Sequence, residues 1–173
     1  MSFKVIENED LEFFNKILGG NFVVTDPEKL KGNSHDETED LSFFPQVILL
    51  PHTTAEIQKI LSYCNENNIC VTPRGAGTGL SGGSIPFKGG VSLDMKRMNR
   101  IINIDEENFQ VITQPGVITE ELQDAVEAKE LFYPVDPASK GSCFIGGNVA
   151  ENSGGPRAVK YGTVKDYVLG LEI

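Results

Sequence analysis

The sequence predicts an α+β fold, and three observations support this class. Helix-capping patterns and short apolar strand patterns alternate along the 173 residues. A strand, a helix and a second strand follow one another between residues 47 and 72. Three further strand patterns then come in succession before the next helix. The length suffices for one domain or for two small lobes that share a site.

The first 44 residues are predicted to form a helical segment ahead of a larger domain at 45–173. Asn8 is expected to cap a helix with an apolar face made of Leu11, Phe14, Ile17 and Leu18. The stretch Asp26-Pro27-Glu28 predicts a second helix start, with a cap, a proline in the first turn and an acid after it. Residues 34–40 are acidic, which favours a solvated loop over a site.

A βαβ unit is predicted next. Residues 47–50 and 69–72 are typical of buried strands, and Thr53 with Glu56 forms a capping box that opens the helix between them. A loop after the second strand then lies at the carboxyl end of a parallel pair, where ligands bind in such sheets. Thr119 is expected to cap a later helix, and further strands are expected at 91–94, 101–104 and 110–113.

The most informative stretch is the glycine-rich loop at residues 73–84. Its five glycines permit positive φ and a close approach of backbone to a ligand, and consecutive N–H groups form an anion-binding nest. The loop is therefore predicted to wrap the pyrophosphate of a dinucleotide; the alternative is a flexible connection. Residues 77–82 fit G-x-G-x-x-G, but a strand follows instead of the helix that a Rossmann loop needs. A Walker A lysine is also missing before Ser84.

Composition excludes several classes of function. A net charge of −10 argues against nucleic acid or an anionic membrane as partner. No apolar run approaches the about 18 residues of a membrane span, and the first residues do not resemble a signal peptide. Three irregularly spaced cysteines favour free thiols in a reducing cytoplasm. Neither histidine has metal-ligand spacing with a cysteine, so no metal site is predicted.

A second segment, residues 139–157, is again dense in Gly, Ser and Asn. One interpretation is a surface loop, but long structureless loops in compact domains are usually functional. Gly146 and Gly147 would let backbone approach a flat ring, while Asn148 and Asn152, one helical turn apart, would offer amide groups on one side. The two glycine-rich segments together predict a bipartite cleft, with one half for phosphates and the other for a flat polar ring.

Three other features receive simpler interpretations. The acidic turn at 105–108 is expected to be solvated rather than catalytic. Arg157 is a candidate substrate anchor, although a phosphate-binding or structural role explains it as well. The run at 167–173 alternates like a strand and has no turn signal after it, so we expect the sequence to be part of a longer protein.

The motifs, taken together, resemble the FAD-linked oxidases that share the FAD-binding domain of p-cresol methylhydroxylase (PCMH) and vanillyl-alcohol oxidase. The group nearest in resemblance contains the FAD subunit of glycolate oxidase, D-lactate dehydrogenase and D-2-hydroxyglutarate dehydrogenase. The likeness covers about residues 45–173, and these motifs are jointly specific. The matching stretches are PRGAGTGLSGG at 73–83, PVDPAS at 134–139, IGGNVAENSGGPR at 145–157, KYG at 160–162 and DYVLGLE at 166–172.

The resemblance implies an FAD-binding PCMH-type domain of two α+β lobes, with the first at about 45–132 and the start of the second at about 133–173, truncated before a C-terminal cap domain. FAD would lie between the lobes. The implied residues of the pyrophosphate loop are Pro73, Arg74, Gly75, Ala76, Gly77, Thr78, Gly79, Leu80, Gly82, Gly83 and Ser84. Those bordering the flavin and adenosine portions are Pro134, Ser139, Gly141, Ser142 and Cys143. Those on the isoalloxazine side are Gly146, Gly147, Asn148, Ala150, Asn152 and Gly155, with a last adenine-side contact at Ile173.

The implied reaction is oxidation of a small 2-hydroxy acid, of the glycolate or D-lactate type, to the 2-oxo acid. No histidine lies in the loop, so FAD is expected to bind noncovalently. Catalytic groups are expected in the cap domain, so no catalytic residue is named and the chain alone is expected to be inactive. Other partners would be the missing cap domain, other subunits or a second copy. The alternatives are a sibling FAD oxidase acting on another alcohol and a fragment that does not retain FAD.

Overall fold

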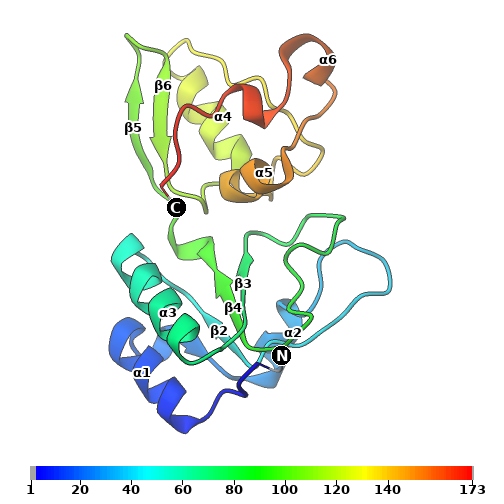
Figure 1. The fold of residues 1–173 in the computed structure, drawn as a ribbon. Helices are drawn as coiled ribbons and strands as arrows, with labels where there is room; N and C mark the ends of the chain where they lie inside the picture. Colours follow the sequence, from blue (N-terminus) through cyan, green and yellow to red (C-terminus); the bar gives the residue numbers. More distant parts are fainter. Residues whose placement is uncertain (1–2, 173) are drawn as a thin grey trace. The chain divides into compact units, whose positions relative to one another are not determined.

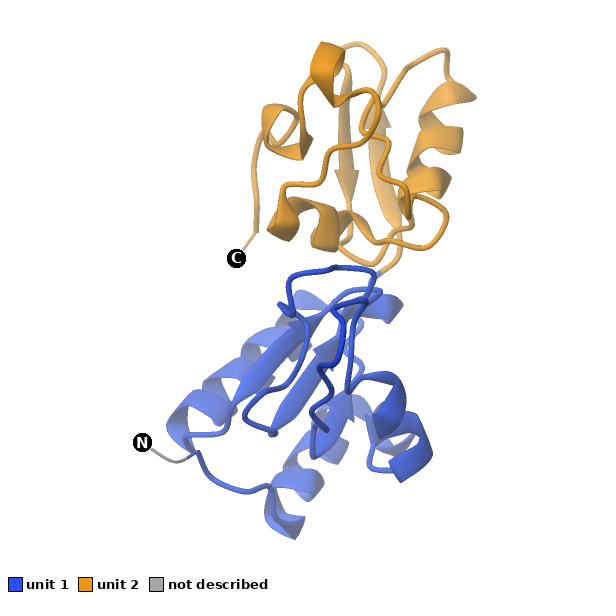
Figure 2. Ribbon diagram, turned by 90° about the vertical axis from the view of Figure 1, so that its right-hand side faces the viewer, with its two compact units in different colours: residues 1–98 blue, residues 99–173 orange. Residues whose placement is uncertain are grey.

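The chain divides between Met98 and Asn99 into two units, coloured separately in Figure 2. The structure, a computed structural model, describes residues 3–172. The lobe boundary expected between residues 132 and 133 falls inside unit 2, the unit that starts at Asn99. The reason is packing, because the hairpin that follows Asn99 shares a core with the helices after it.

Unit 1, which ends at Met98, is built on a four-stranded sheet (Figure 1). The strand order is β1-β2-β4-β3; β4 pairs in parallel with β2 and with β3, and β1 runs antiparallel to β2. The predicted βαβ unit is therefore present, with β4 inserted between its two strands. The elements are α1 (Asn8–Leu18), η1 (Gly20–Phe22), β1 (Val23–Val24), α2 (Pro27–Gly32), β2 (Val47–Leu49), α3 (Thr54–Glu66), β3 (Val71–Arg74), β4 (Val91–Asp94) and η2 (Met95–Arg97).

Helices α1 and α3 pack against this sheet and form the core of unit 1. The predicted capping box of α3 is confirmed, since Thr53 Oγ1 accepts from Glu56 N at 3.2 Å and Glu56 Oε2 accepts from Thr53 N at 3.2 Å. Burial raises the pKa of the Cys64 thiol to about 12, so this side chain stays protonated and packs as an apolar group. The buried core residues are Phe14, Leu18, Val47, Leu49, Ile60, Cys64, Ile69, Val91 and Leu93.

The start of α1 differs from the prediction, because the N-cap is Glu7 and not Asn8. Asp10, in the first turn, accepts a hydrogen bond from Glu7 N at 2.8 Å. The Asp10 side chain is fully buried and also accepts from Lys4 Nζ and Tyr63 Oη, each at 2.7 Å. Burial alone would raise the pKa of Asp10, but the hydrogen bonds from Lys4, Glu7 and Tyr63 outweigh it and lower the pKa below 3.8.

We expect Asp10→Asn to lower the free energy of unfolding by about 2 kcal/mol near neutral pH, because the amide has no charge and only one acceptor oxygen for the donors Lys4, Glu7 and Tyr63. Since the folded-state pKa is lowered, the contribution of Asp10 is complete above its unfolded value of 3.8 and disappears as the pH falls through the folded pKa. Urea unfolding over a pH series measures this. The difference between the two proteins should shrink below pH 3.8; a difference independent of pH would contradict the assignment, and Glu9→Gln, at an exposed position of the same turn, is the control.

Unit 2 consists of a β-hairpin with helices on one side (Figure 1). Its elements are β5 (Ile101–Asp105), β6 (Gln110–Thr113), α4 (Thr119–Glu127), α5 (Ile145–Glu151), α6 (Ala158–Tyr161) and η3 (Val164–Asp166). Strands β5 and β6 pair antiparallel, from Ile101 opposite Thr113 to Asp105 opposite Gln110. The buried core residues are Val117, Leu122, Val126 and Ile145, with Ile101, Ile104 and Val111 of the hairpin packed against them.

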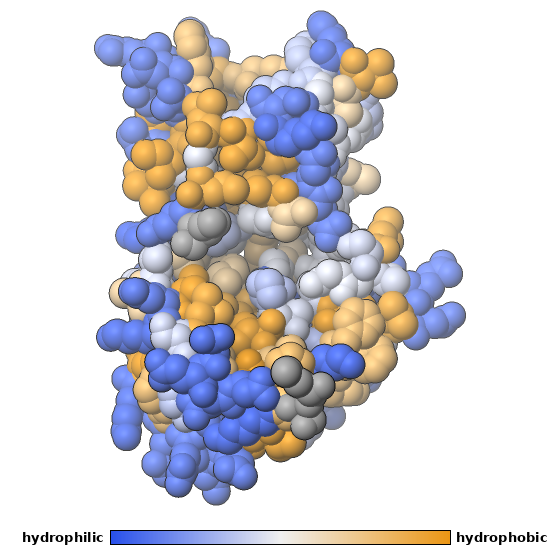
Figure 3. Space-filling view, viewed as in Figure 1, coloured by the Kyte–Doolittle hydropathy of each residue, from blue (hydrophilic) through white to orange (hydrophobic). Residues whose placement is uncertain are grey.

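Residues 168–172 form no strand, although their alternation predicts one. A strand needs a neighbour to satisfy its backbone groups, and in the described part of unit 2 β5 and β6 pair only with each other. Leu169 and Leu171 stay exposed, as do Ile102 and Ile112 of the hairpin. Figure 3 shows apolar surface gathered over this part of unit 2. Within residues 3–172, no helix has the length and apolar character to cross a bilayer.

Candidate functional site

The glycine-rich loop leaves β3 at Arg74, at the edge of the sheet where the parallel strands β2, β3 and β4 end. Residues 75–90 contain neither helix nor strand, so the loop joins β3 directly to β4, as predicted for a loop of non-Rossmann type. Gly77 and Gly82 have φ of +76° and +73°, in the left-handed region that glycine adopts without strain. These two positions give the loop its curled course.

Arg74, predicted to bind pyrophosphate, is used inside unit 1. Its Nη1 donates to His35 O at 2.8 Å and its Nη2 to Gly32 O at 3.0 Å. The residue is 7% exposed. Burial lowers the pKa of its guanidinium, while Asp94 and Asp36 oppose this change. The guanidinium therefore supports the loop from within the fold.

Gly77 lies directly on that guanidinium. A Cβ added at Gly77 would be 2.2 Å from Arg74 Nη2 and 2.8 Å from Cζ. The backbone of the loop thus approaches Arg74 more closely than a residue with a side chain permits. This contact explains the glycine at position 77 without reference to a ligand.

The remaining predicted loop residues differ in exposure. Gly79 is tied to the residues before β2, because its carbonyl accepts from Glu37 N at 3.0 Å. Leu80 is 77% exposed, so its side chain contributes nothing to the core. The exposed members are Pro73, Leu80 and Gly83; the partly buried ones are Gly75, Ala76, Gly77, Thr78, Gly79 and Ser84; Gly82 is buried.

The second glycine-rich segment is partly helical, which corrects the expectation of a long loop. Gly146, Gly147, Asn148 and Ala150 lie in α5. Gly146 is required by packing, since a Cβ there would be 2.6 Å from Pro115 Cβ, whereas no atom lies within 4 Å of the Cβ position of Gly147. The fold therefore leaves the space beside Gly147 open.

Asn148 and Asn152 do not act on one side as predicted. Asn148 is buried and donates through Nδ2 to Thr119 Oγ1. Asn152 leaves the helix in a left-handed conformation with φ of +52°, and its Oδ1 accepts from Thr163 Oγ1 at 2.9 Å and from Lys165 N at 3.0 Å. The Asn152 side chain thus fixes the turn that leads into η3.

Thr119 belongs to this group of residues, although the sequence indicates only a helix cap. The N-cap of α4 is Ile118, and Thr119 is the first helical residue and fully buried. Its Oγ1 lies 3.3 Å from Cys143 O and 3.2 Å from Cys143 Sγ. Thr119 therefore joins α4, the turn before Cys143 and α5 into one hydrogen-bonded group.

The remaining candidates of unit 2 lie in the connections around α5. Pro134 and Cys143 are buried, Ser139 is partly buried, and Gly141 and Ser142 are exposed. Ser139 O accepts from Ser142 N and Cys143 N, each at 2.8 Å, which closes a tight turn. Gly155 has φ of +144°, and a Cβ there would be 1.9 Å from Asp136 O. Ile173 lies outside the described residues.

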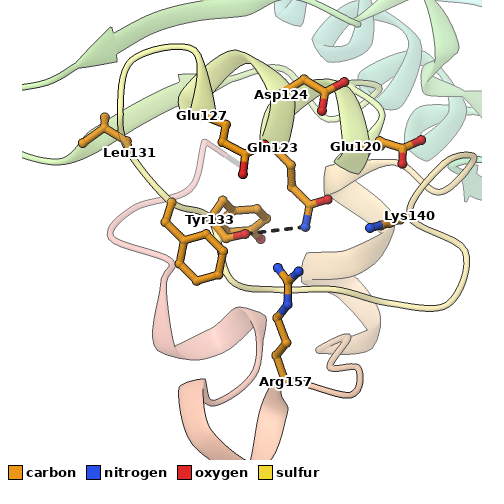
Figure 4. Close-up of a pocket in the computed structure, with 9 residues that line it drawn as sticks. Glu120, Gln123, Asp124, Glu127, Leu131, Tyr133, Lys140 and Arg157 are labelled. Atoms are coloured by element: carbon orange, nitrogen blue, oxygen red, sulfur yellow. Dashed lines mark hydrogen bonds between the residues drawn. The ribbon is translucent and has the colours of Figure 1, made fainter.

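Arg157 lines a small pocket of unit 2 beside α4 (Figure 4). The cavity volume of about 110 Å³ is below the about 300 Å³ at which ligand pockets begin. The guanidinium lies 5.3 Å from the centre of the Phe132 ring, and its Nε is 3.5 Å from Asp136 Oδ2. These contacts favour the structural role among the three considered for Arg157. Within residues 3–172, no three His, Cys, Asp or Glu side chains are grouped to hold a metal ion.

Comparison with known proteins places these segments in a family. Residues 45–173, which include both glycine-rich segments, match the family described as "FAD binding domain". The chain belongs to the FAD-binding domain family. FAD is the cofactor of this family, and the mixed helix and sheet fold of the chain is of the PCMH type: p-cresol methylhydroxylase with substrate bound gives a TM-score of 0.64 at 27% identity, over 74% of this chain and 25% of that one.

Two relatives of this FAD-binding domain are much longer proteins. Glycolate oxidase subunit GlcD of Bacillus subtilis (strain 168) is 49% identical over 140 residues, covering 81% of this chain and 30% of GlcD. Mitochondrial D-2-hydroxyglutarate dehydrogenase of Danio rerio is 39% identical over 173 residues, covering 100% of this chain and 32% of that protein. The chain thus spans about a third of the length of these relatives.

Proposed function

We propose that the chain is the FAD-binding portion of a flavin-dependent oxidoreductase that oxidises a 2-hydroxy acid, of the glycolate or D-lactate type, to the 2-oxo acid. The observation that carries the proposal is the 49% identity with glycolate oxidase subunit GlcD. Bound FAD supplies the acceptor for the hydride that leaves the substrate. The proposal assigns the substrate-binding and proton-accepting groups to a part of the protein outside these 173 residues.

Within the chain, the proposal gives different tasks to the two glycine-rich segments. The backbone of the loop at 73–84 binds the pyrophosphate, helped by the turns at Gly77 and Gly82. Helix α5 borders the flavin ring, supported by the open space beside Gly147. The loop contains neither histidine nor cysteine, so binding is noncovalent.

The partners proposed beyond the cofactor are a cap domain or other subunits. The exposed apolar residues Ile102, Ile112, Leu169 and Leu171 support this, because exposed apolar patches mark surfaces that another part covers (Figure 3). All three cysteines are free thiols, in agreement with the cytoplasmic location that we propose.

We expect Gly147→Ala to weaken FAD binding without destabilising the fold. Alanine is favoured over glycine in a helix by about 1 kcal/mol, and apart from its chain neighbours and the backbone of its own helix the new methyl group meets no atom within 4 Å. Gly146→Ala is the matched control, since its methyl group would collide with Pro115 and should lower the melting temperature. Thermal unfolding without FAD and titration with FAD measure the two effects. If Gly147→Ala is stable and binds FAD as tightly as the unaltered chain, α5 does not border the flavin ring.

The function itself is tested in two steps. The flavin absorbance of the purified chain and its titration with FAD report cofactor binding; a chain that binds no FAD would favour the inactive fragment. The protein at the length of its relatives is then supplied with glycolate, D-lactate or a simple phenolic alcohol and a dye acceptor. Turnover of a 2-hydroxy acid supports the proposal, whereas turnover of the alcohol alone supports the sibling oxidase.

A further inference from the structure

Residues that precede the matched FAD-binding domain at 45–173 form hydrogen bonds with Arg74 and with the glycine-rich loop. Arg74 donates to the carbonyls of Gly32 and His35, and Glu37 N donates to Gly79 O. These three partners lie at residues 32–37, a stretch that we call the brace, whereas the family match begins at residue 45. Three hydrogen bonds of the loop region therefore depend on chain outside the matched domain.

The brace has a fixed position on the sheet. Asn33 Nδ2 donates to Ser92 Oγ at 3.0 Å and lies 3.4 Å from Asp94 Oδ2, both on β4. Asn33 is 8% exposed and Ser34 is 1% exposed. Ser34 Oγ also donates to Lys31 O at 2.8 Å, at the end of α2. The brace is thus fixed to β4 and α2, and its carbonyls in turn hold the Arg74 side chain in place.

The Arg74 guanidinium connects the brace to the glycine-rich loop. Its two Nη atoms bond two different carbonyls of the brace, and the Gly77 backbone packs against the same group. Nη1 also lies 3.5 Å from Ser84 Oγ, at the far end of the loop. A lysine has the charge but no planar fork, so it cannot hold both carbonyls in this way.

We propose that Arg74 is a positioning residue, which uses the brace to set the curvature of the glycine-rich loop for the pyrophosphate instead of bonding the pyrophosphate itself. This inference rests on the proposed function, in which the loop binds that group. It also makes residues 32–37, outside the matched domain, part of the machinery that determines FAD affinity.

The test compares Arg74→Lys with Arg74→Met in FAD titrations of the whole chain. Positioning predicts that both variants lose at least about tenfold in FAD affinity, since neither side chain can hold both carbonyls at once. Direct pairing with pyrophosphate predicts that the lysine variant keeps most of the affinity, and that outcome would overturn the proposal. Positioning also predicts that the dependence of the FAD dissociation constant on salt is unchanged in Arg74→Met; a markedly weaker dependence would count against it.

Arg97→Lys is the matched control, because the Arg97 guanidinium donates to Leu50 O and lies over the Phe22 ring, both in unit 1 and neither in the glycine-rich loop. Its FAD affinity should equal that of the unaltered chain; a loss equal to that of Arg74→Lys would show a general effect on unit 1 and overturn the proposal. Thermal unfolding without FAD verifies that each variant is folded. If the unaltered chain binds no FAD, the proposed function fails. If the unaltered chain and Arg74→Lys bind FAD equally well, only the positioning role of Arg74 fails.

Asn33→Ala tests the brace through a residue for which no cofactor contact is predicted. Without the Asn33 amide, the brace loses its attachment to β4 while Arg74 remains intact. FAD affinity should fall, and combining the substitution with Arg74→Lys should add little, because both act through one set of contacts. Unchanged affinity in Asn33→Ala, or full additivity in the double variant, would contradict the proposal.

Discussion

Gly77→Ala should lower the FAD affinity of the chain by about thirtyfold, which corresponds to about 2 kcal/mol. Residue 77 has φ of +76°, and a Cβ there would be 2.2 Å from a guanidinium that two carbonyls hold in place. The alanine loop therefore relaxes to another course, and binding must restore the curled one. Titration with FAD measures the loss, and Gly77→Val should abolish flavin retention because a β-branched side chain crowds the loop further.

The control for this prediction is Gly19→Ala. Gly19 also lies in unit 1 with positive φ, at +83°, but no atom lies within 4 Å of its Cβ position. Alanine there is strained by a φ of +83° and a ψ of +148°, outside the loop, so stability should fall and FAD affinity should not change. An equal loss of affinity in both variants, or none in Gly77→Ala, would refute the pyrophosphate assignment.

Gly155→Ala should destabilise unit 2 by about 4 kcal/mol, the sum of backbone strain and overpacking. The Cβ would be 1.9 Å from the carbonyl oxygen of Asp136 and 2.4 Å from its carbon, and φ is +144°. A backbone carbonyl cannot turn aside as a side chain does. Thermal unfolding should show a melting temperature lower by about 10 °C.

Gly154→Ala is the neighbouring control for this effect. Its Cβ would meet Ala158 and Thr163 at 3.4 Å, close to ordinary contact, and its φ is not in the left-handed region. The melting temperature of this variant should stay near that of the unaltered chain. Equal melting temperatures for Gly154→Ala and Gly155→Ala would show that the segment at 155 can shift away from Asp136.

The elements that could be predicted from sequence are those whose signals are local. The capping box at Thr53 and Glu56 locates the start of α3, and the cap at Asp26 locates α2. Strand β4 begins and ends where its apolar pattern does. These signals involve residues within one turn or one strand, so no distant contact is needed to interpret them.

Helix α5 shows why part of the site could not be predicted. Gly146 and Gly147 have the lowest helix propensity apart from proline, so the local pattern indicates a loop. The helix forms because distant residues support it: Gly146 packs on Pro115, and Asn148 bonds to Thr119, 29 residues earlier. Tertiary contacts of this kind leave no periodic signal in the sequence.

The brace escaped prediction for a related reason. Its acidic residues are typical of a solvated loop, yet Asn33, Ser34 and Asp36 are buried. The contacts that bury it span 39 and 42 residues between Arg74 and the carbonyls of His35 and Gly32. Backbone carbonyls have no residue type, so no motif could indicate that these positions accept from an arginine.

The three thiols differ in burial, so they should differ in their reactivity toward a labelling reagent. Cys64 and Cys143 are buried, and the raised pKa of Cys64 removes its reactive thiolate, whereas Cys70 is partly exposed. A maleimide dye added to the native chain should therefore attach at Cys70 first. That residue directly precedes β3, the strand that leads into the glycine-rich loop. A fluorophore attached at Cys70, without any substitution in the chain, should therefore report FAD binding at the glycine-rich loop.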